Sequence, residues 1–250
     1  MTERLSADSS ACPADSAVLL RENLNQIRQH IADACAACGR SEKEITLLGV
    51  TKTVDSERIN AAIAAGIRQI GENRVQEFLQ KREALHLEGI RTHLIGHLQT
   101  NKVEKIVGSV DMIESVDSLR LAQAIASASR KRGIVTDVLV EVNIGGEAAK
   151  SGIAPEAAED LLHQLSSLKG IQVRGMMTVP PISETDMEKR RYFSRMKKLF
   201  VDIRSKNIDN IHMDILSMGM SDDYIQAILE GSTEVRIGSA LFGKRVYPSL

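Results

Sequence analysis

The hydrophobic positions of this chain change their spacing near residue 40. Between residues 16 and 38 they recur at the spacing of one helix face, and Gly39 follows as a stop signal. Beyond that point, short runs rich in aliphatic and β-branched residues alternate with helical stretches. The expected strands are the eight runs 46–52, 68–73, 92–97, 111–117, 137–144, 171–179, 213–219 and 234–243.

The stretches between these runs carry helix start and stop signals of their own. The expected caps and first-turn residues are Asp55, Asp117 or Ser118, Pro155 and Asp222, and the expected stops are Gly66, Gly133 and Gly231. Strands that alternate with helices predict βαβ units and a parallel sheet. Eight such units in roughly 200 residues are typical of a (β/α)8 barrel, to which residues 16–38 would add an extra N-terminal helix. A doubly wound open sheet is the alternative.

Composition supports one packed unit. The chain has 250 residues, 43% of them hydrophobic and 26% charged, so we expect a disordered polar tail over 1–15 and a single domain over 16–250. Its net charge of -1 offers no field for nucleic acid or for an anionic membrane. Three cysteines in the first sixth of the chain favour a reducing, cytoplasmic setting, and no run is long enough to span a membrane.

Lys52 ends the first expected strand, LLGVTK. In a (β/α)8 barrel the reactive groups project from the C-terminal ends of the strands. A lysine held there among apolar neighbours is partly desolvated, which disfavours the ammonium form and leaves a nucleophilic amine able to form Schiff bases. Alternation puts Lys52 on the side of Leu48 and Val50, but parity alone does not say whether that side is the barrel interior.

Glycines and serines follow the last two expected strands. Strand 7 ends in SMGMSDD, with Ser217 and Ser221, and strand 8 carries Arg236, Gly238 and Ser239. Glycines let backbone N–H groups approach a ligand, and the loops after strands 7 and 8 commonly form the phosphate site of this fold. Because closure brings strand 8 beside strand 1, the lysine and the two loops together indicate a ligand with both an aldehyde and a phosphate. A Schiff-base aldolase acting on a sugar phosphate would satisfy the same pattern.

Several motifs carry a resemblance to a known family. The chain is similar, from about residue 24 to 247, to the pyridoxal phosphate homeostasis proteins, which have the N-terminal barrel fold of alanine racemase. The matching motifs are GVTK (49–52), GENRVQE (71–77), HLIGHLQTNK (93–102), KSG (150–152), RGMMTVP (174–180), SMGMSDD (217–223) and GSTEVRIGSALFG (231–243).

The resemblance implies a cofactor, pyridoxal 5′-phosphate, and a role for each matched residue. Lys52 resembles the lysine that forms the Schiff base, and Asn73 is similar to a family residue near the cofactor. Ser217, Gly238 and Ser239 resemble phosphate ligands. Arg236 resembles the arginine that faces the pyridine nitrogen in racemase-type sites.

The resemblance also bears on whether the protein is an enzyme. A guanidinium does not give up its proton, so a facing pyridine nitrogen stays unprotonated and the ring is a poor electron sink. A racemase also needs a second acid/base group opposite the lysine, and we expect no second domain to supply one because the sequence ends at Leu250. We therefore expect a cofactor-binding protein with little or no turnover, and a lone barrel without the dimer-forming domain of a racemase favours a monomer. The resemblance implies a role in homeostasis of pyridoxal phosphate and in amino-acid and keto-acid balance. A racemase or decarboxylase is the alternative.

Two further patterns are assigned no function. Cys35 and Cys38 form a CxxC on a helix without a second pair, so packing is favoured over a zinc or redox site, and no metal site is expected. The basic run 188–198 has apolar positions at helical spacing, which favours a solvated helix face over a nucleic-acid patch.

The open site could pass the cofactor transiently to apoenzymes that depend on it.

Overall fold

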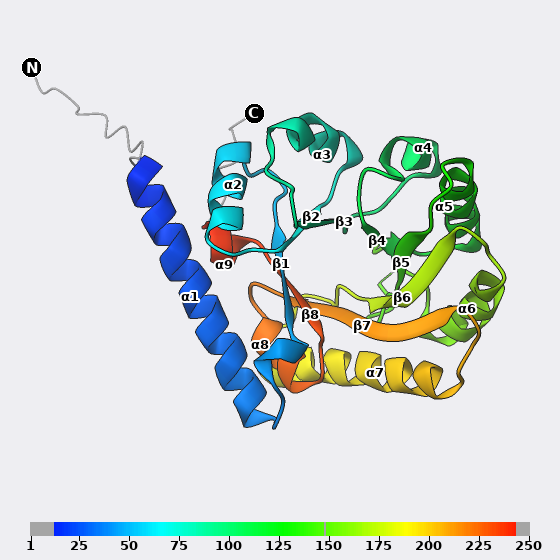
Figure 1. The fold of residues 1–250 in the computed structure, drawn as a ribbon. Helices are drawn as coiled ribbons and strands as arrows, with labels where there is room; N and C mark the ends of the chain where they lie inside the picture. The colour runs from blue at the N-terminus through cyan, green and yellow to red at the C-terminus, as the bar shows by residue number, and fades with distance from the viewer. Residues whose placement is uncertain (1–12, 148, 244–250) are drawn as a thin grey trace, which may run out of the picture.

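The chain folds into a closed barrel of eight parallel strands (Figure 1). The structure is a computed structural model that describes residues 13–147 and 149–243, so most of the expected tail lies outside the described residues. The strands are β1 Thr46–Val50, β2 Gln69–Glu72, β3 Arg91–Leu94, β4 Met112–Val116, β5 Thr136–Glu141, β6 Ile171–Met177, β7 Ile211–Met220 and β8 Glu234–Ile237. Each strand pairs with the next, and β1 pairs with β8. The predicted barrel is confirmed, and the open-sheet alternative is wrong.

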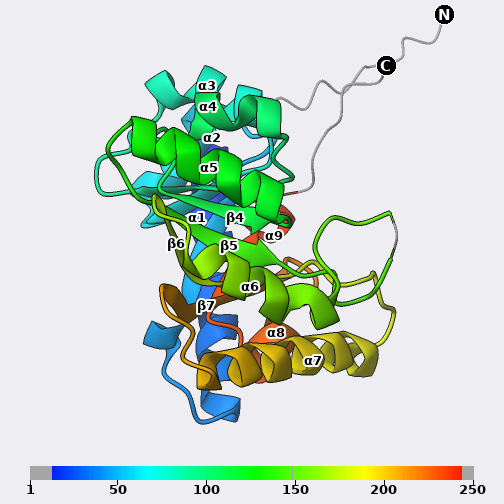
Figure 2. The ribbon, with the colours of Figure 1, turned by 90° about the vertical axis from the view of Figure 1, so that its right-hand side faces the viewer.

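Helices follow the strands and surround the barrel (Figure 2). They are α1 Pro13–Ala37, α2 Ser56–Ala64, α3 Val75–Lys81, α4 Val103–Ile106, α5 Leu119–Lys131, α6 Ala158–Ser166, α7 Asp186–Ser205, α8 Tyr224–Leu229 and α9 Ser239–Phe242. Short 3-10 segments lie at Glu42–Glu44 (η1), Arg82–Ala84 (η2), Thr100–Lys102 (η3) and Pro155–Ala157 (η4). The basic run falls within α7, whose buried face carries Phe193, Met196 and Phe200, as its spacing predicted.

The extra N-terminal helix is present and begins three residues before its expected start. Helix α1 lies outside the barrel against α2, α8 and α9, and buries Leu24, Ile27 and Cys35 there (Figure 1). Apolar residues repeating every three to four positions turn this face toward its neighbours. The thiol of Cys38, the first residue after α1, donates to the carbonyl oxygens of Ala34 and Cys35 in the last turn of the helix.

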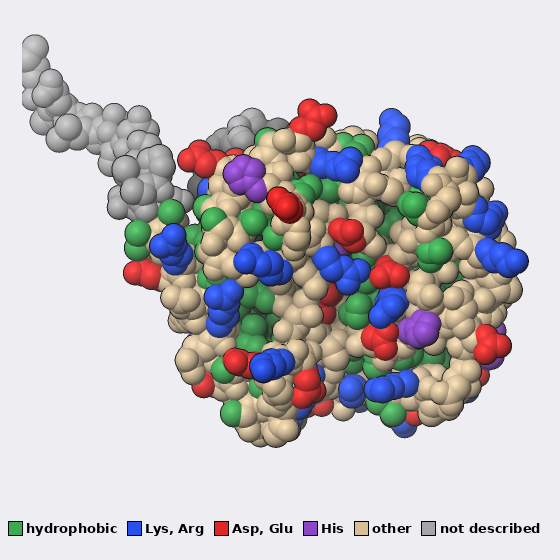
Figure 3. Space-filling view, in the orientation of Figure 1, with side chains coloured by type: hydrophobic (Ala, Val, Ile, Leu, Met, Phe, Trp, Pro, Cys, Tyr) green, Lys and Arg blue, Asp and Glu red, His purple; other side chains and the backbone are tan. Residues whose placement is uncertain are grey.

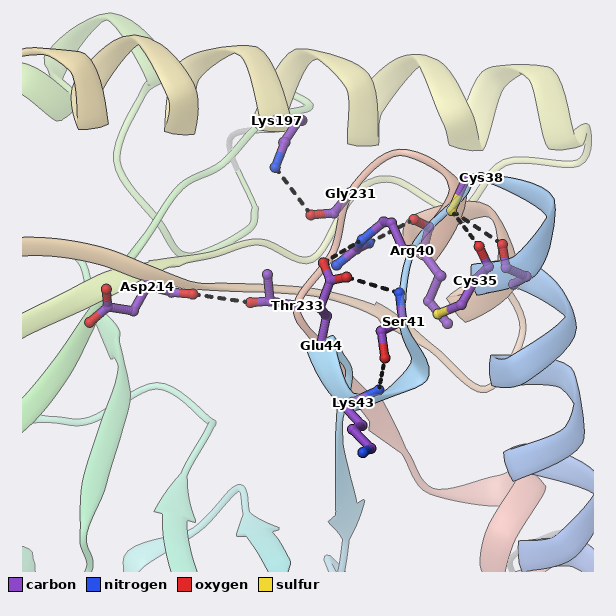
Figure 4. A network of polar contacts seen from close by, with 12 residues as sticks. Cys35, Cys38, Arg40, Ser41, Lys43, Glu44, Lys197, Asp214, Gly231 and Thr233 are labelled. Carbon is purple, nitrogen blue, oxygen red and sulfur yellow. Dashed lines mark hydrogen bonds and ion pairs between the residues drawn. The ribbon is translucent and has the colours of Figure 1, made fainter.

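Polar contacts secure the turn between α1 and β1 (Figure 4). The hydroxyl of Ser41 accepts from Lys43 N, and Ser41 N donates to the carboxylate of Glu44, which forms a capping box around η1. Arg40 Nε donates to Glu44 at 3.2 Å, while its Nη1 donates to the carbonyl of Ile228 at the end of α8. The entry to β1 is therefore tied to the end of α8.

The side chains inside the barrel follow from strand alternation. Val235 and Ile237 of β8 pack against the helices, so Glu234 and Arg236 point inward. Met112, Leu139 and Met177 form an apolar cluster of their own in the interior, and Glu114 and Glu141 follow two residues after the first two of these. The interior thus holds an apolar cluster together with buried charged side chains from β4, β5 and β8.

Acidic and basic side chains are interspersed over the face seen in Figure 3, in keeping with the net charge of -1. Over the described residues, no helix has both the length and the apolar character that crossing a membrane requires.

Candidate functional site

Lys52 follows β1 on the side of the barrel interior. A Cβ placed on Gly49 would lie 3.5 Å from Leu241 of α9, so Gly49 faces the helices. Leu48 and Val50 therefore face inward, and Lys52 is half-buried in the turn just after β1. Continued alternation predicts that Lys52, which shares their parity, projects toward the C-terminal mouth. The sequence did not decide whether the side of Leu48 and Val50 faces the barrel interior, and in the structure it does.

Asn73 occupies the equivalent place after β2. A Cβ on Gly96 would lie 2.4 Å from the carbonyl oxygen of Asn73, so only glycine allows the loop after β3 to pack this closely. Ser115 holds the same loop by donating to the carbonyl of Gly96 at 2.7 Å. The Oδ1 atom of Asn73 is buried and has no hydrogen-bond partner among the described residues, which leaves an acceptor for a donor from outside the chain.

Arg236 lies in the interior on the neighbouring strand β8. It pairs in register with Leu48 of β1 and is 3% exposed. Its Nη1 donates to Ser217 Oγ at 2.6 Å, and its Nη2 donates to the carbonyl oxygen of Thr178 at 2.8 Å. Because these two contacts come from the adjacent strand β7 and from the residue after β6, the guanidinium is held at two points.

Ser217 lies within β7, and Ser221 is the first residue after it. Ser217, expected at a phosphate, is fully buried, and its hydroxyl donates to Glu114 Oε2 at 2.8 Å while accepting from Arg236. Ser221 Oγ instead accepts from Gly238 N and from Ala240 N, each at 3.2 Å. The N–H groups at the start of α9 therefore converge on the second serine of SMGMS, and Ser239 is exposed beside them.

A cluster of ionisable side chains lies deeper in the interior. His93 Nδ1 is 2.6 Å from Glu114 Oε1, and ligand atoms of His93, Glu114 and Glu234 all lie within 4.8 Å of one another. Burial acts to raise the pKa of Glu114, but the hydrogen bond and charge of His93 outweigh it and lower that pKa. Burial and the nearby Glu114 raise the pKa of Glu234 to about 8. Within this cluster, Glu114 is thus the carboxylate whose pKa is lowered, beside His93 and Arg236, and Glu234 is the one whose pKa is raised.

The chain was compared with known proteins. The family model described as the alanine racemase N-terminal domain matches residues 19–246. A pyridoxal phosphate homeostasis protein of Aquifex aeolicus is 43% identical over 226 residues, which cover 90% of this chain and 98% of that relative. The chain belongs to the pyridoxal phosphate homeostasis proteins, within the alanine racemase N-terminal domain family.

Solved structures agree with this family. A protein of unknown function from Bifidobacterium adolescentis matches with a TM-score of 0.88 and 37% identity, covering 96% of this chain and 98% of the other. PipY of Synechococcus elongatus, solved with PLP bound, matches with a TM-score of 0.79 and 32% identity, covering 90% of this chain and all of PipY.

In this member of the homeostasis family, the structure adds residues that the sequence did not single out. Ser221 was named in the loop after strand 7 but was not among the residues assigned to the phosphate. Glu72, Glu77 and Lys81 form a cluster behind the ends of β1 and β2. Of these contacts, only the i,i+4 spacing of Glu77 and Lys81 was visible in the sequence.

Proposed function

We propose that this protein binds pyridoxal 5′-phosphate through Lys52 and acts in cofactor homeostasis with little or no turnover. Its similarity to pyridoxal phosphate homeostasis proteins supports this, as does its similarity to PipY, which was solved with PLP bound. The observation that carries the proposal is the orientation of Lys52. Its parity directs it to a mouth whose neighbouring strand ends supply backbone N–H groups, a hydroxyl and a buried guanidinium.

The residues at the mouth fit such a cofactor. When bound, it would supply an aldehyde whose carbonyl carbon bonds to the lysine nitrogen as the oxygen leaves in one water molecule. Ser221, Gly238 and Ser239 would hold the phosphate, because N–H and hydroxyl donors converge there. Asn73 would orient the ring through its unpartnered Oδ1. Ser217 would position Arg236, in place of the phosphate contact that the resemblance implied.

Arg236 supports the non-enzymatic part of the proposal. A guanidinium remains protonated, so it would donate to a ring nitrogen and keep it unprotonated. Ser217 and Thr178 hold the guanidinium there, and no carboxylate accepts a hydrogen bond from it among the contacts of the described residues. A site of this kind binds the ring without strengthening it as an electron sink.

A racemase would need a second acid/base group at the mouth. Tyr192 packs against the apolar core from α7, and the hydroxyl of Tyr224 lies 2.7 Å from His30 Nδ1, outside the barrel. Tyr247 lies outside the described residues. Neither described tyrosine is placed to work opposite Lys52, which favours the carrier over the racemase.

Reductive trapping tests the proposal. Purified protein is incubated with pyridoxal phosphate, reduced with borohydride and digested, and the modified lysines are identified by mass spectrometry. We expect the adduct on Lys52, its loss in Lys52→Ala, and no loss in Lys105→Ala, which removes an exposed lysine on α4. Equal labelling of many lysines, or none of Lys52, would contradict the proposal.

Delivery to other proteins needs its own experiment. We propose that the loaded protein passes its cofactor to apoenzymes, acting as a cytoplasmic monomer. The expected result is that loaded protein activates an apoenzyme faster than an equal amount of free cofactor. If a trap for free cofactor abolishes the activation, the protein only releases the cofactor and does not deliver it.

A further inference from the structure

A buried ion-pair cluster lies behind the ends of β1 and β2. Lys81 Nζ, from the end of α3, is 2.6 Å from Glu77 Oε1 and 3.0 Å from Glu72 Oε1. The side chain of Glu72 is 2% exposed, and those of Lys81 and Glu77 are 16% and 20% exposed. Ion pairs this sheltered are weakly screened, so breaking one side leaves a poorly solvated charge.

The cluster holds the backbone on both sides of Lys52. Lys81 Nζ donates to the carbonyl oxygen of Thr51 at 3.0 Å. On the other side, Thr53 N donates to Glu77 Oε1 at 2.5 Å. One lysine–glutamate pair therefore fixes the peptide group before Lys52 and the one after it.

The backbone after Lys52 needs this support. Thr53 has φ of 61°, in the left-handed region that β-branched residues rarely adopt. A conformation of this kind costs on the order of 1–3 kcal/mol and persists only where surrounding contacts hold it. The bond from Thr53 N to Glu77 is such a contact, and a change of φ at Thr53 would redirect the chain that carries Lys52.

The same cluster ties in the second strand end. Thr51 Oγ1 donates to Glu72 Oε1 at 2.9 Å, and Asn73 N donates to Glu72 Oε2 at 3.3 Å. Thr51 and Glu72 each precede a residue assigned to the mouth, and alternation puts them on the opposite, helix-facing side. The contacts of Thr51 and Glu72 on the helix-facing side of the sheet thus hold the backbone next to Lys52 and Asn73, which are assigned to the mouth.

The pKa values of the two carboxylates in the cluster are shifted in opposite directions. Burial acts to raise the pKa of Glu77, but the hydrogen bonds from Lys81 and from Thr53 N outweigh it and lower that pKa. Burial raises the pKa of Glu72, and Lys81 opposes the rise. Of the two carboxylates that contact Lys81, Glu77 is therefore the one whose pKa is lowered.

We propose that Glu77 and Lys81 are positioning residues that hold Lys52 in the orientation needed to bond the cofactor aldehyde. The inference rests on the proposed function, because it concerns the same lysine. Neither residue touches the cofactor. They act through the backbone at Thr51 and Thr53, so removing them leaves Lys52 chemically intact and misdirected.

Amide hydrogen exchange tests the contact in protein without cofactor. Glu77→Ala removes the acceptor of Thr53 N, while Glu77→Gln keeps an acceptor oxygen and loses the charge. We expect exchange at Thr53 to become about tenfold faster in Glu77→Ala, with Glu77→Gln between it and the unmodified protein. Lys206→Met is the matched control, because Lys206 makes a 2.6 Å ion pair with Glu159 on the exposed surface between α7 and α6.

Reductive trapping at limiting cofactor tests the consequence. We expect half-labelling of Lys52 to need about tenfold more pyridoxal phosphate in Glu77→Ala and Lys81→Met than in the unmodified protein, with partial recovery in Glu77→Gln. Circular dichroism identifies any variant that is unfolded. If Lys81→Met is unfolded, the comparison of Glu77→Gln with Glu77→Ala still tests the positioning role. Labelling and Thr53 exchange in Glu77→Ala within about twofold of the unmodified protein would overturn the positioning role. Absence of labelling in the unmodified protein would instead overturn the proposed function.

Discussion

Glu141 should make the stability of this protein fall as the pH rises. It ends β5 inside the barrel, is 7% exposed, and its Oε2 has no hydrogen-bond partner among the described residues. Burial, with a smaller contribution from the charge of Asp117, raises its pKa to about 7, and Arg236 opposes the rise. Replacing Glu141 with Gln keeps the shape of the side chain and removes the ionisation.

The sign and size follow from the two pKa values. Between pH 4.5 and about 7, the folded state keeps a proton on Glu141 that the unfolded state has lost, so stability falls as the pH rises through that window. The difference between 4.5 and about 7, at about 1.4 kcal/mol for each pKa unit, gives about 3 kcal/mol above pH 7. Part of this loss is already present at about pH 5. We expect Glu141→Gln to gain about 2 kcal/mol on the unmodified protein between about pH 5 and about pH 8.

Urea unfolding measures this difference. Far-ultraviolet circular dichroism is the suitable probe, since the sequence has no tryptophan. The control is Glu156→Gln, which removes an exposed carboxylate next to α6 and should leave the pH dependence of the unmodified protein unchanged. If the stability difference between Glu141→Gln and the unmodified protein is the same at both pH values, the reasoning from burial is refuted.

Three further outcomes are expected. Glu234→Gln should gain stability over the unmodified protein from pH 4.5 up to about 8, because burial keeps Glu234 protonated in the folded state, and thermal unfolding at several pH values checks this. Gly175→Ala should lose on the order of 3 kcal/mol or more in urea unfolding, because Gly175 has φ of 154° and its Cβ would lie 1.8 Å from the carbonyl oxygen of Ile215. Ser221→Ala should bind pyridoxal phosphate about tenfold more weakly in equilibrium dialysis, and unchanged binding would remove Ser221 from the phosphate site.

The order of the elements could be predicted from the sequence because each strand and helix has its own spacing of apolar residues. The end of the chain shows the limit of that method. Residues 234–243 were expected to form one strand, yet β8 stops at Ile237 and residues 239–242 form α9. Short apolar runs fit a strand and a buried helical turn equally well, so periodicity could not place the boundary at Gly238.

The position of a residue beside a strand end was predictable from the sequence, and contacts that cross the barrel were not. Lys52 was singled out because it ends the first expected strand. Its predicted direction depends on which face of β1 packs against α9, and the sequence did not show that this is the face of Gly49. Ser217 and Ser221 could not be separated by sequence, because both belong to one Gly/Ser motif. Their roles differ because Glu114, 103 residues away in the chain, takes the hydroxyl of Ser217.

Strand alternation links the two halves of this site. Leu48, Val50 and Lys52 face the interior, so Thr51 must face the helices, and the carboxylate of Glu72 and the amine of Lys81 meet it there. A shift of β1 by one residue would send the lysine to the helix-facing side, against Lys81, and bring Thr51 to the mouth. The pairing of β1 with β8, which sets Leu48 opposite Arg236, opposes that shift at one edge, and the contacts with Glu72 oppose it at the other. The register of a single short strand therefore decides whether the amine and the guanidinium can serve the same ligand.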